Sequence, residues 1–89
     1  MPLKGRVKAA KISVGTTAVE LYISGKSRRT ISIKNNSSTV VYIGGKNVTA
    51  AQGYPLANRE TMDVDLADEA HIYGITESGT AEVRILEVD

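Results

Sequence analysis

The sequence predicts an all-β protein, a small single-domain β-sandwich or barrel of about seven to eight strands in a jelly-roll-like or immunoglobulin-like arrangement. Apolar and polar residues alternate with period two along most of the chain, and helical periodicity is almost absent. Clusters of Gly, Ser and Asn separate the alternating segments at short intervals, as they do between antiparallel strands. A length of 89 residues fits one domain.

Composition predicts an aliphatic core and self-association. A domain of this size buries only about 60–65 % of the surface that its unfolded chain exposes, so its stability margin is slim. The sequence has no cysteine and one histidine, which leaves no disulfide and no Cys/His metal cluster. With these aids missing, we expect no metal, no cofactor, and a partner subunit as the aid to stability. Phe and Trp are absent as well, so the core must be aliphatic.

The chain divides into a basic N-terminal arm, residues 1–11, and a β-sandwich domain, residues 12–89. We expect the arm to become ordered on a partner protein. No apolar run approaches the roughly 20 residues that span a bilayer, and the N-terminus lacks the apolar stretch of a secretory signal. The sequence therefore predicts no membrane partner and a protein that works where it is made or in something assembled there.

Alternation of apolar and polar residues begins near residue 8, within the last part of the arm, and predicts the early strands. In residues 29–35, Ile31 and Ile33 share one face, while the residues between them are polar. The Asn-Asn-Ser-Ser turn that follows predicts a hairpin with residues 39–45. Strand alternation of this kind occurs in residues 8–14, 17–23, 29–35, 39–45, 60–66, 70–76 and 79–88.

The later strands show the clearest alternation. Residues 60–66 place Met62 and Val64 on one face and Asp63 and Asp65 on the other, so one face of this strand meets water. A Glu-Ser-Gly turn joins residues 70–76 to residues 79–88, and its glycine suits the positive φ of a short hairpin loop. We therefore expect these last two segments to pair as a hairpin.

A polar, glycine-marked loop, residues 44–59, interrupts the strand pattern. Its Gly-Gly-Lys run lacks the spacing of a phosphate-binding loop and no helix follows it. Pro55 cannot donate a hydrogen bond to a central ladder, so it must lie at a turn or an edge. The loop is predicted to be a structural seam or a contact edge, with Asn47, Tyr54 and Arg59 as its candidate contact residues.

The residue inventory predicts no enzyme. The single histidine, His71, lies in a strand pattern and has no Cys nucleophile to activate. Asp63 and Asp65 share a face, as catalytic or cation-binding carboxylates must, but no calcium-loop spacing of oxygen ligands surrounds them. We expect a solvated acidic face and no catalytic residue.

Charge is segregated along the chain. Residues 1–59 contain ten Lys or Arg and one acidic residue, whereas residues 60–89 contain nine Asp or Glu and one Arg. Basic and acidic strands can pair within one sheet, or the basic stretch of one subunit can meet the acidic strands of its neighbour. The candidate partner-binding residues are Lys4, Arg6, Lys8, Lys11, Arg28, Arg29, Asp63 and Asp65.

Nucleic acid is not the expected partner. The basic N-terminus could release phosphate counterions, but no aromatic residues are interleaved with its charges to stack on bases. The acidic last third of the chain would repel a polyanion. Protein is the partner that the charge pattern favours.

Nearly the whole chain, about residues 12–89, resembles small β-sandwich structural proteins of tailed bacteriophages, of the capsid decoration or head-fibre type. The resemblance lies in the order and spacing of short strand and turn motifs. In this chain the motifs are Val14–Ala18, Arg28–Asn35, Val41–Thr49, Gly53–Leu56, Glu60–Leu66, Ile72–Ile75 and Ser78–Glu87.

The resemblance implies a virion role. The expected protein is made in the host bacterial cytoplasm and binds the capsid surface as a decoration (cement) protein, in contact with the major capsid protein or another virion protein. It implies no catalytic residue. A symmetric oligomer suits repeated docking on a shell, and we expect a homotrimer because capsids offer threefold sites. The alternatives are the base of a head or tail fibre and, from the polar loop, a carbohydrate- or receptor-binding module.

Overall fold

The structure is a computed structural model that describes residues 7–21, 29–66 and 71–88. These residues form eight strands, which confirms the predicted all-β sandwich. No helix among them is long and apolar enough to cross a membrane. The strands are β1 (Val7–Val14), β2 (Val19–Glu20), β3 (Arg29–Asn35), β4 (Val41–Gly44), β5 (Tyr54–Leu56), β6 (Thr61–Leu66), β7 (Tyr73–Thr76) and β8 (Ala81–Val88).

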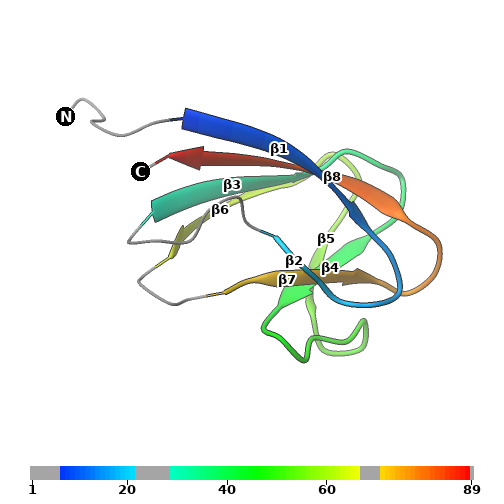
Figure 1. Cartoon of the computed structure of the whole chain (residues 1–89). Coiled ribbons are helices and arrows are strands. Elements are labelled where there is room, and N and C mark those ends of the chain that lie inside the picture. The colour runs from blue at the N-terminus through cyan, green and yellow to red at the C-terminus, as the bar shows by residue number, and fades with distance from the viewer. Residues whose placement is uncertain (1–6, 22–28, 67–70, 89) are drawn as a thin grey trace.

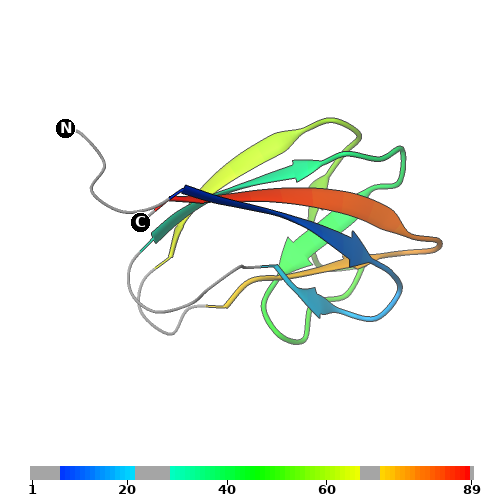
Figure 2. The same cartoon turned by 45° about the horizontal axis from the view of Figure 1, so that its top comes forward.

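The strands form two four-stranded antiparallel sheets that pack face to face (Figure 1). One sheet has the order β1-β8-β3-β6 and the other has the order β2-β7-β4-β5. The view in Figure 2 shows β1 and β6 at opposite edges of the first sheet. We call these the long sheet and the short sheet, because the first contains the longer strands.

The strand order is that of a jelly roll, which decides between the two predicted topologies. β1 pairs with β8, β2 with β7, β3 with β6 and β4 with β5, as in one long hairpin that is rolled up. Two further pairings, β3 with β8 and β4 with β7, close the roll. Eight strands in two packed sheets with this nesting match the jelly-roll architecture.

The two predicted hairpins are wrong. β3 and β4 follow each other in the sequence but belong to different sheets, and the same is true of β7 and β8. Each short connection crosses from one layer to the other instead of turning back within a sheet. Gly79, in the turn between β7 and β8, does adopt the predicted positive φ, at 72°.

The core is aliphatic, as predicted, and lies between the sheets. Ile31 and Ile33 of β3 are fully buried, and so are Val83 of β8 and Val41 of β4. Their alternation with exposed residues follows from the opposite directions of successive side chains in a strand. Pro55 lies in β5, one of the two edge strands of the short sheet, which confirms its predicted edge position.

The expected arm, residues 1–11, is partly a strand. Residues 7–11 belong to β1, which pairs with β8 over its whole length. Residues 1–6 lie outside the described residues. The segment 7–11 is therefore part of the long sheet, consistent with the alternation already present from residue 8.

Gly74 in β7 lies where no other side chain fits. A Cβ atom at this position would lie 2.9 Å from Leu21 Cδ1 and 3.2 Å from Val41 Cγ1. Both neighbours are fully buried and have no free space to enter. We expect Gly74→Ala to lower the free energy of unfolding by about 1–3 kcal/mol, which calorimetry would detect as a fall of roughly 5–20 °C in Tm.

Gly45→Ala is the matched control for Gly74→Ala. An added Cβ at Gly45 meets nothing within 4 Å, so we expect a Tm within a few degrees of the parent or slightly above it. Equal melting temperatures for the two variants would show that the contacts around Gly74 do not limit packing.

Candidate functional site

The outer side of the long sheet carries half of the charged side chains that the structure describes. The side chains that alternate with the buried ones along its strands point away from the core. Six of them are charged, and we call this surface the charged face. Its charged residues are Lys11, Lys34, Asp63, Asp65, Glu82 and Arg84.

Three cations form a row across the charged face. Lys11 of β1 lies directly opposite Arg84 of β8, and Arg84 lies directly opposite Lys34 of β3. Neighbouring strands are about 4.8 Å apart, and like charges placed directly opposite are destabilising. Neither lysine makes an ion pair with any described residue. The two lysines of the cation row therefore keep their charge for an outside partner, whereas Arg84 is ion-paired to Glu82.

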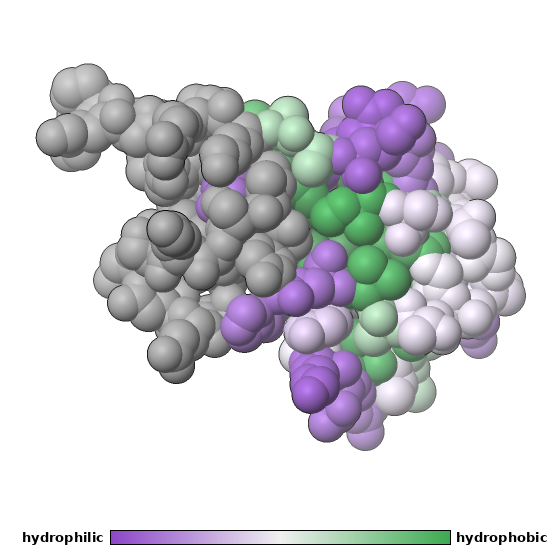
Figure 3. Space-filling view, in the orientation of Figure 1, coloured by the Kyte–Doolittle hydropathy of each residue, from purple (hydrophilic) through white to green (hydrophobic). Residues whose placement is uncertain are grey.

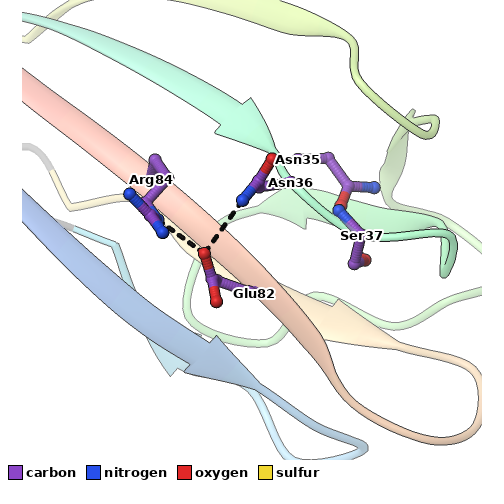
Figure 4. Close-up of polar contacts among 5 residues, drawn as sticks. All are labelled: Asn35, Asn36, Ser37, Glu82 and Arg84. Carbon is purple, nitrogen blue, oxygen red and sulfur yellow. Dashed lines mark hydrogen bonds and ion pairs between the residues drawn. The ribbon is translucent and has the colours of Figure 1, made fainter.

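Glu82 is the carboxylate nearest to the cation row, and it is held by two donors (Figure 4). Asn36 Nδ2 donates to Glu82 Oε2 at 3.0 Å, and Arg84 Nε donates to the same oxygen at 2.6 Å. These hydrogen bonds, with further help from the charge of Lys11, lower the pKa of Glu82 from its ordinary value of 4.5. A shallow hollow of about 350 Å³ lies beside it, lined by Lys11, Ser13 and Thr80 among others.

The lowered pKa of Glu82 predicts a pH dependence of stability. A carboxyl group whose folded pKa lies below its unfolded pKa contributes stability above the unfolded pKa, near 4.5. That contribution is lost as the pH falls further, through the folded pKa. In urea unfolding measured from pH 6 to pH 3, we expect the stability advantage of the parent over Glu82→Gln to shrink below about pH 4.5. An advantage that stays constant over this range would contradict the prediction, and Glu77→Gln is the charge-matched control.

Two carboxylates occupy the β6 edge of the charged face. Thr30 Oγ1 donates to Asp65 Oδ1 at 2.6 Å, and Ser32 Oγ donates to Asp63 Oδ1 at 2.7 Å. Both aspartates are exposed, as predicted, and the part of the chain that the structure describes contains no cluster of three or more potential metal ligands. The hydroxyl groups of β3 thus orient two solvated carboxylates along one edge.

The basic and acidic strands do pair within one sheet, since β1 and β3 alternate with β8 and β6. The ion pairs that are described join Arg84 to Glu82 within β8 and His71 Nδ1 to Glu20 Oε2. Neither of these two ion pairs joins a basic strand of the long sheet to an acidic one.

The structure describes some of the predicted partner-binding residues and not others. Lys11, Asp63 and Asp65 share the charged face but lie at opposite edges of it, Lys11 on β1 and the two aspartates on β6. Lys8 and Arg29 are strand residues of the same sheet whose side chains are not described. The remaining predicted residues, Lys4, Arg6 and Arg28, lie outside the described residues.

The predicted loop contacts are divided between two places. Asn47 belongs to the loop that joins β4 to β5, and Tyr54 begins β5 beside it with 64 % of its surface exposed. A hollow of about 270 Å³ in this loop is lined by Asn47, Gln52 and neighbouring backbone. Arg59, by contrast, follows the other end of β5, where its φ is 68° and its backbone nitrogen donates to Asn35 O at 2.8 Å. The structure therefore separates Arg59 from the other two residues.

His71 lies just before β7 instead of within a strand, and its ring is half exposed. Its Nδ1 contacts the carboxylate of Glu20, the last residue of β2. The contact ties the start of β7 to the edge of the short sheet.

Asn35 is the important polar residue that sequence reasoning missed. It is fully buried at the end of β3, and Figure 4 shows it beside Ser37. Its Nδ2 donates to Thr39 O at 2.7 Å and to Leu56 O at 2.8 Å, and its Oδ1 accepts from the backbone nitrogen of Ser37 at 3.1 Å. Period-two alternation from Ile31 and Ile33 does place residue 35 inward, and that was the available signal.

No protein-family model matches the chain, and no curated protein matches it.

Proposed function

We propose that the chain is a non-enzymatic virion structural protein of a tailed bacteriophage, a capsid decoration protein that binds the outer shell as a symmetric oligomer. The observation that carries the proposal is the cation row on the charged face. Lys11 and Lys34 each lie opposite Arg84, which is ion-paired to Glu82, and neither lysine has an ion pair among the described residues. An acidic protein surface that docks there would pair with these two exposed lysines.

Two further considerations support a virion setting. The sequence resembles small phage structural proteins over nearly its whole length. The jelly-roll architecture also occurs in viral capsid proteins, although a shared architecture alone is an analogy and does not assign function. A small oligomer that engages several shell sites at once binds far more tightly than one domain does.

The copy number of the chain in purified particles tests the proposal. Quantitative mass spectrometry against the major shell protein gives the ratio directly. One copy per shell subunit, or a simple fraction of it, is expected for a decoration protein. A handful of copies per particle would move the chain to the base of a head or tail fibre, and absence from particles would overturn the virion role.

Binding to shells that lack the protein tests the role of the cation row. Lys34 is exposed in the middle of the long sheet, so Lys34→Glu should weaken shell binding and reduce its dependence on salt. Lys46→Glu is the matched control, because Lys46 is an exposed cation of the loop between β4 and β5 and is not part of the charged face. Equal loss of binding in both variants would argue against the cation row as the docking surface.

The exposed Tyr54 favours a second candidate, a carbohydrate- or receptor-binding module. Tyr54 is exposed and directly follows Gly53, which lines the same hollow as Asn47 and Gln52. This part of the surface therefore offers an apolar ring and amide groups for hydrogen bonds. A glycan array that gives a signal with the parent protein and none with Tyr54→Ala would support this candidate over the first.

A further inference from the structure

The edge strands of the two sheets differ in length and in proline content. The edges of the short sheet are β2, with two residues, and β5, with three residues that include Pro55. Short strands and proline are devices that prevent pairing with another chain. The edges of the long sheet are β1, with eight residues, and β6, with six, and neither contains proline or glycine. Within the described residues, no strand pairs with the outer edge of β1 or of β6.

The inner sides of these two edge strands are incompletely covered. Three apolar side chains pack against the core while only partly buried, and they are Ile12 of β1 and Met62 and Val64 of β6. Figure 3 shows apolar surface between the layers on the side of the molecule where β1 forms the edge. A further strand beside each edge would complete the burial of these side chains.

The outer sides of the same strands carry opposite charges. Lys11 lies on the outer side of β1, and Asp63 and Asp65 lie on the outer side of β6. Two β1 edges brought together would oppose lysines, and two β6 edges would oppose aspartates, both of which are destabilising. Only a β1 edge beside a β6 edge brings opposite charges together.

We propose that β1 of one copy pairs with β6 of a second copy, so that the long sheet continues from subunit to subunit. Neighbouring strands of this four-stranded sheet alternate in direction. A second copy in the same orientation therefore presents β1 antiparallel to β6 with no reversal. Such a head-to-tail contact closes into a ring when its rotation permits. The inference deepens the oligomer of the proposed function and rests on it for the biological setting of the ring.

The residue pattern selects a register for this contact. Placing Lys11 opposite Asp63 also places Ile12 opposite Met62 and Ala10 opposite Val64, so apolar residues meet on the inner side. The same register puts Ser13 opposite Thr61 on the outer side and pairs all six residues of β6. Ala10 gives the partner strand room to approach closely.

Cysteine cross-linking tests the contact, since the chain has no cysteine of its own. Ser13 and Thr61 lie on opposite edges of one sheet, three strand spacings or about 14 Å apart. A disulfide requires Cα atoms within about 7 Å, so any disulfide between these positions joins two chains. We expect an equimolar mixture of S13C and T61C to give a mixed disulfide dimer, and S13C alone or T61C alone to give none.

The controls decide among the outcomes. A9C/L86C places two cysteines directly opposite each other within one chain and must oxidise under the same conditions. If it oxidises while the mixture gives no mixed dimer, the proposal is overturned. Self-linked dimers of S13C or of T61C in place of the mixed product would also overturn it, because they would show symmetric pairing of like edges.

Charge reversal adds a readout that depends on the predicted register. Lys11→Glu is added to S13C, or Asp63→Lys is added to T61C. Either change should lower the yield of the mixed dimer about tenfold, because a cross-strand attraction becomes a repulsion. The two reversals together should restore it. Lys34→Glu alters the same cation row on an interior strand and should leave the yield unchanged. If the mixed dimer forms but the protein is absent from purified particles, the edge contact stands and the virion role is overturned.

Discussion

Replacing Asn35 by alanine is expected to lower the melting temperature by roughly 15–30 °C, the fall that corresponds to about 3–5 kcal/mol in a domain of this size. The side chain is fully buried and holds the carbonyl oxygens of Thr39 and Leu56 with its two amide hydrogens. Alanine would remove the amide donor to Leu56 O and the acceptor for Ser37 N, and Thr39 O would keep only the bond from Ser37 Oγ at 3.2 Å. Each buried group left unsatisfied costs about 1–3 kcal/mol. The loss would be a large fraction of a typical net stability of about 5–15 kcal/mol.

Calorimetry or urea unfolding checks this expectation, with Asn36→Ala as the matched control. Asn36 is the adjacent residue of the same type, but it is exposed. Its side chain donates a hydrogen bond to the exposed Glu82 Oε2. We expect the control to cost less than about 1 kcal/mol. If the two alanine variants melt within a few degrees of each other, Asn35 does not hold the end of β3 to β5.

Asn35→Asp separates the role of the amide from the role of the side-chain shape. Aspartate has nearly the same size and can still accept from Ser37, but its ionised form cannot donate to the two carbonyl oxygens. A buried carboxylate is also costly to ionise. We therefore expect it to be at least as destabilising as alanine near neutral pH, and to recover relative to alanine as acid protonates it.

Local patterns in the sequence were sufficient to predict which way side chains point. Alternation correctly placed Ile31 and Ile33 in the core and Asp63 and Asp65 in solvent. Side-chain direction is a property of each strand alone and follows from the pleat. The same rule would have identified Asn35 as buried, had its polar side chain not suggested a turn.

Strand pairing could not be predicted in the same way. β3 and β4 are separated by a short polar turn, which normally indicates a hairpin, yet the partners of β3 are β6 and β8. Alternation gives the face of a strand but not its neighbour, and the nested pairs of a jelly roll join segments far apart in the chain. The same limit applies to the cation row, because only the register aligns Lys11, Arg84 and Lys34.

Ile33→Ala is expected to have an effect of similar size on stability, about 3–5 kcal/mol or a fall of roughly 15–30 °C in Tm. Ile33 is fully buried in β3, between Met62 of β6 and Ile85 of β8. Truncation removes buried methyl and methylene groups and leaves a cavity that the surrounding sheet cannot close completely. Ile33→Val should cost only about 0.5–1.5 kcal/mol, because it removes one methylene group.

Unfolding measured at several protein concentrations distinguishes this core effect from an interface effect. Leu86→Ala, on the outer side of β8 where the side chain is 42 % exposed, is the control and should cost less than about 1 kcal/mol. The loss caused by Ile33→Ala arises within one subunit, so it should be the same at every concentration. A partly buried edge residue such as Ile12 should instead cost more at concentrations where subunits associate, because association stabilises by mass action. A concentration-dependent loss for Ile33→Ala would show that folding of the long sheet and subunit association cannot be separated.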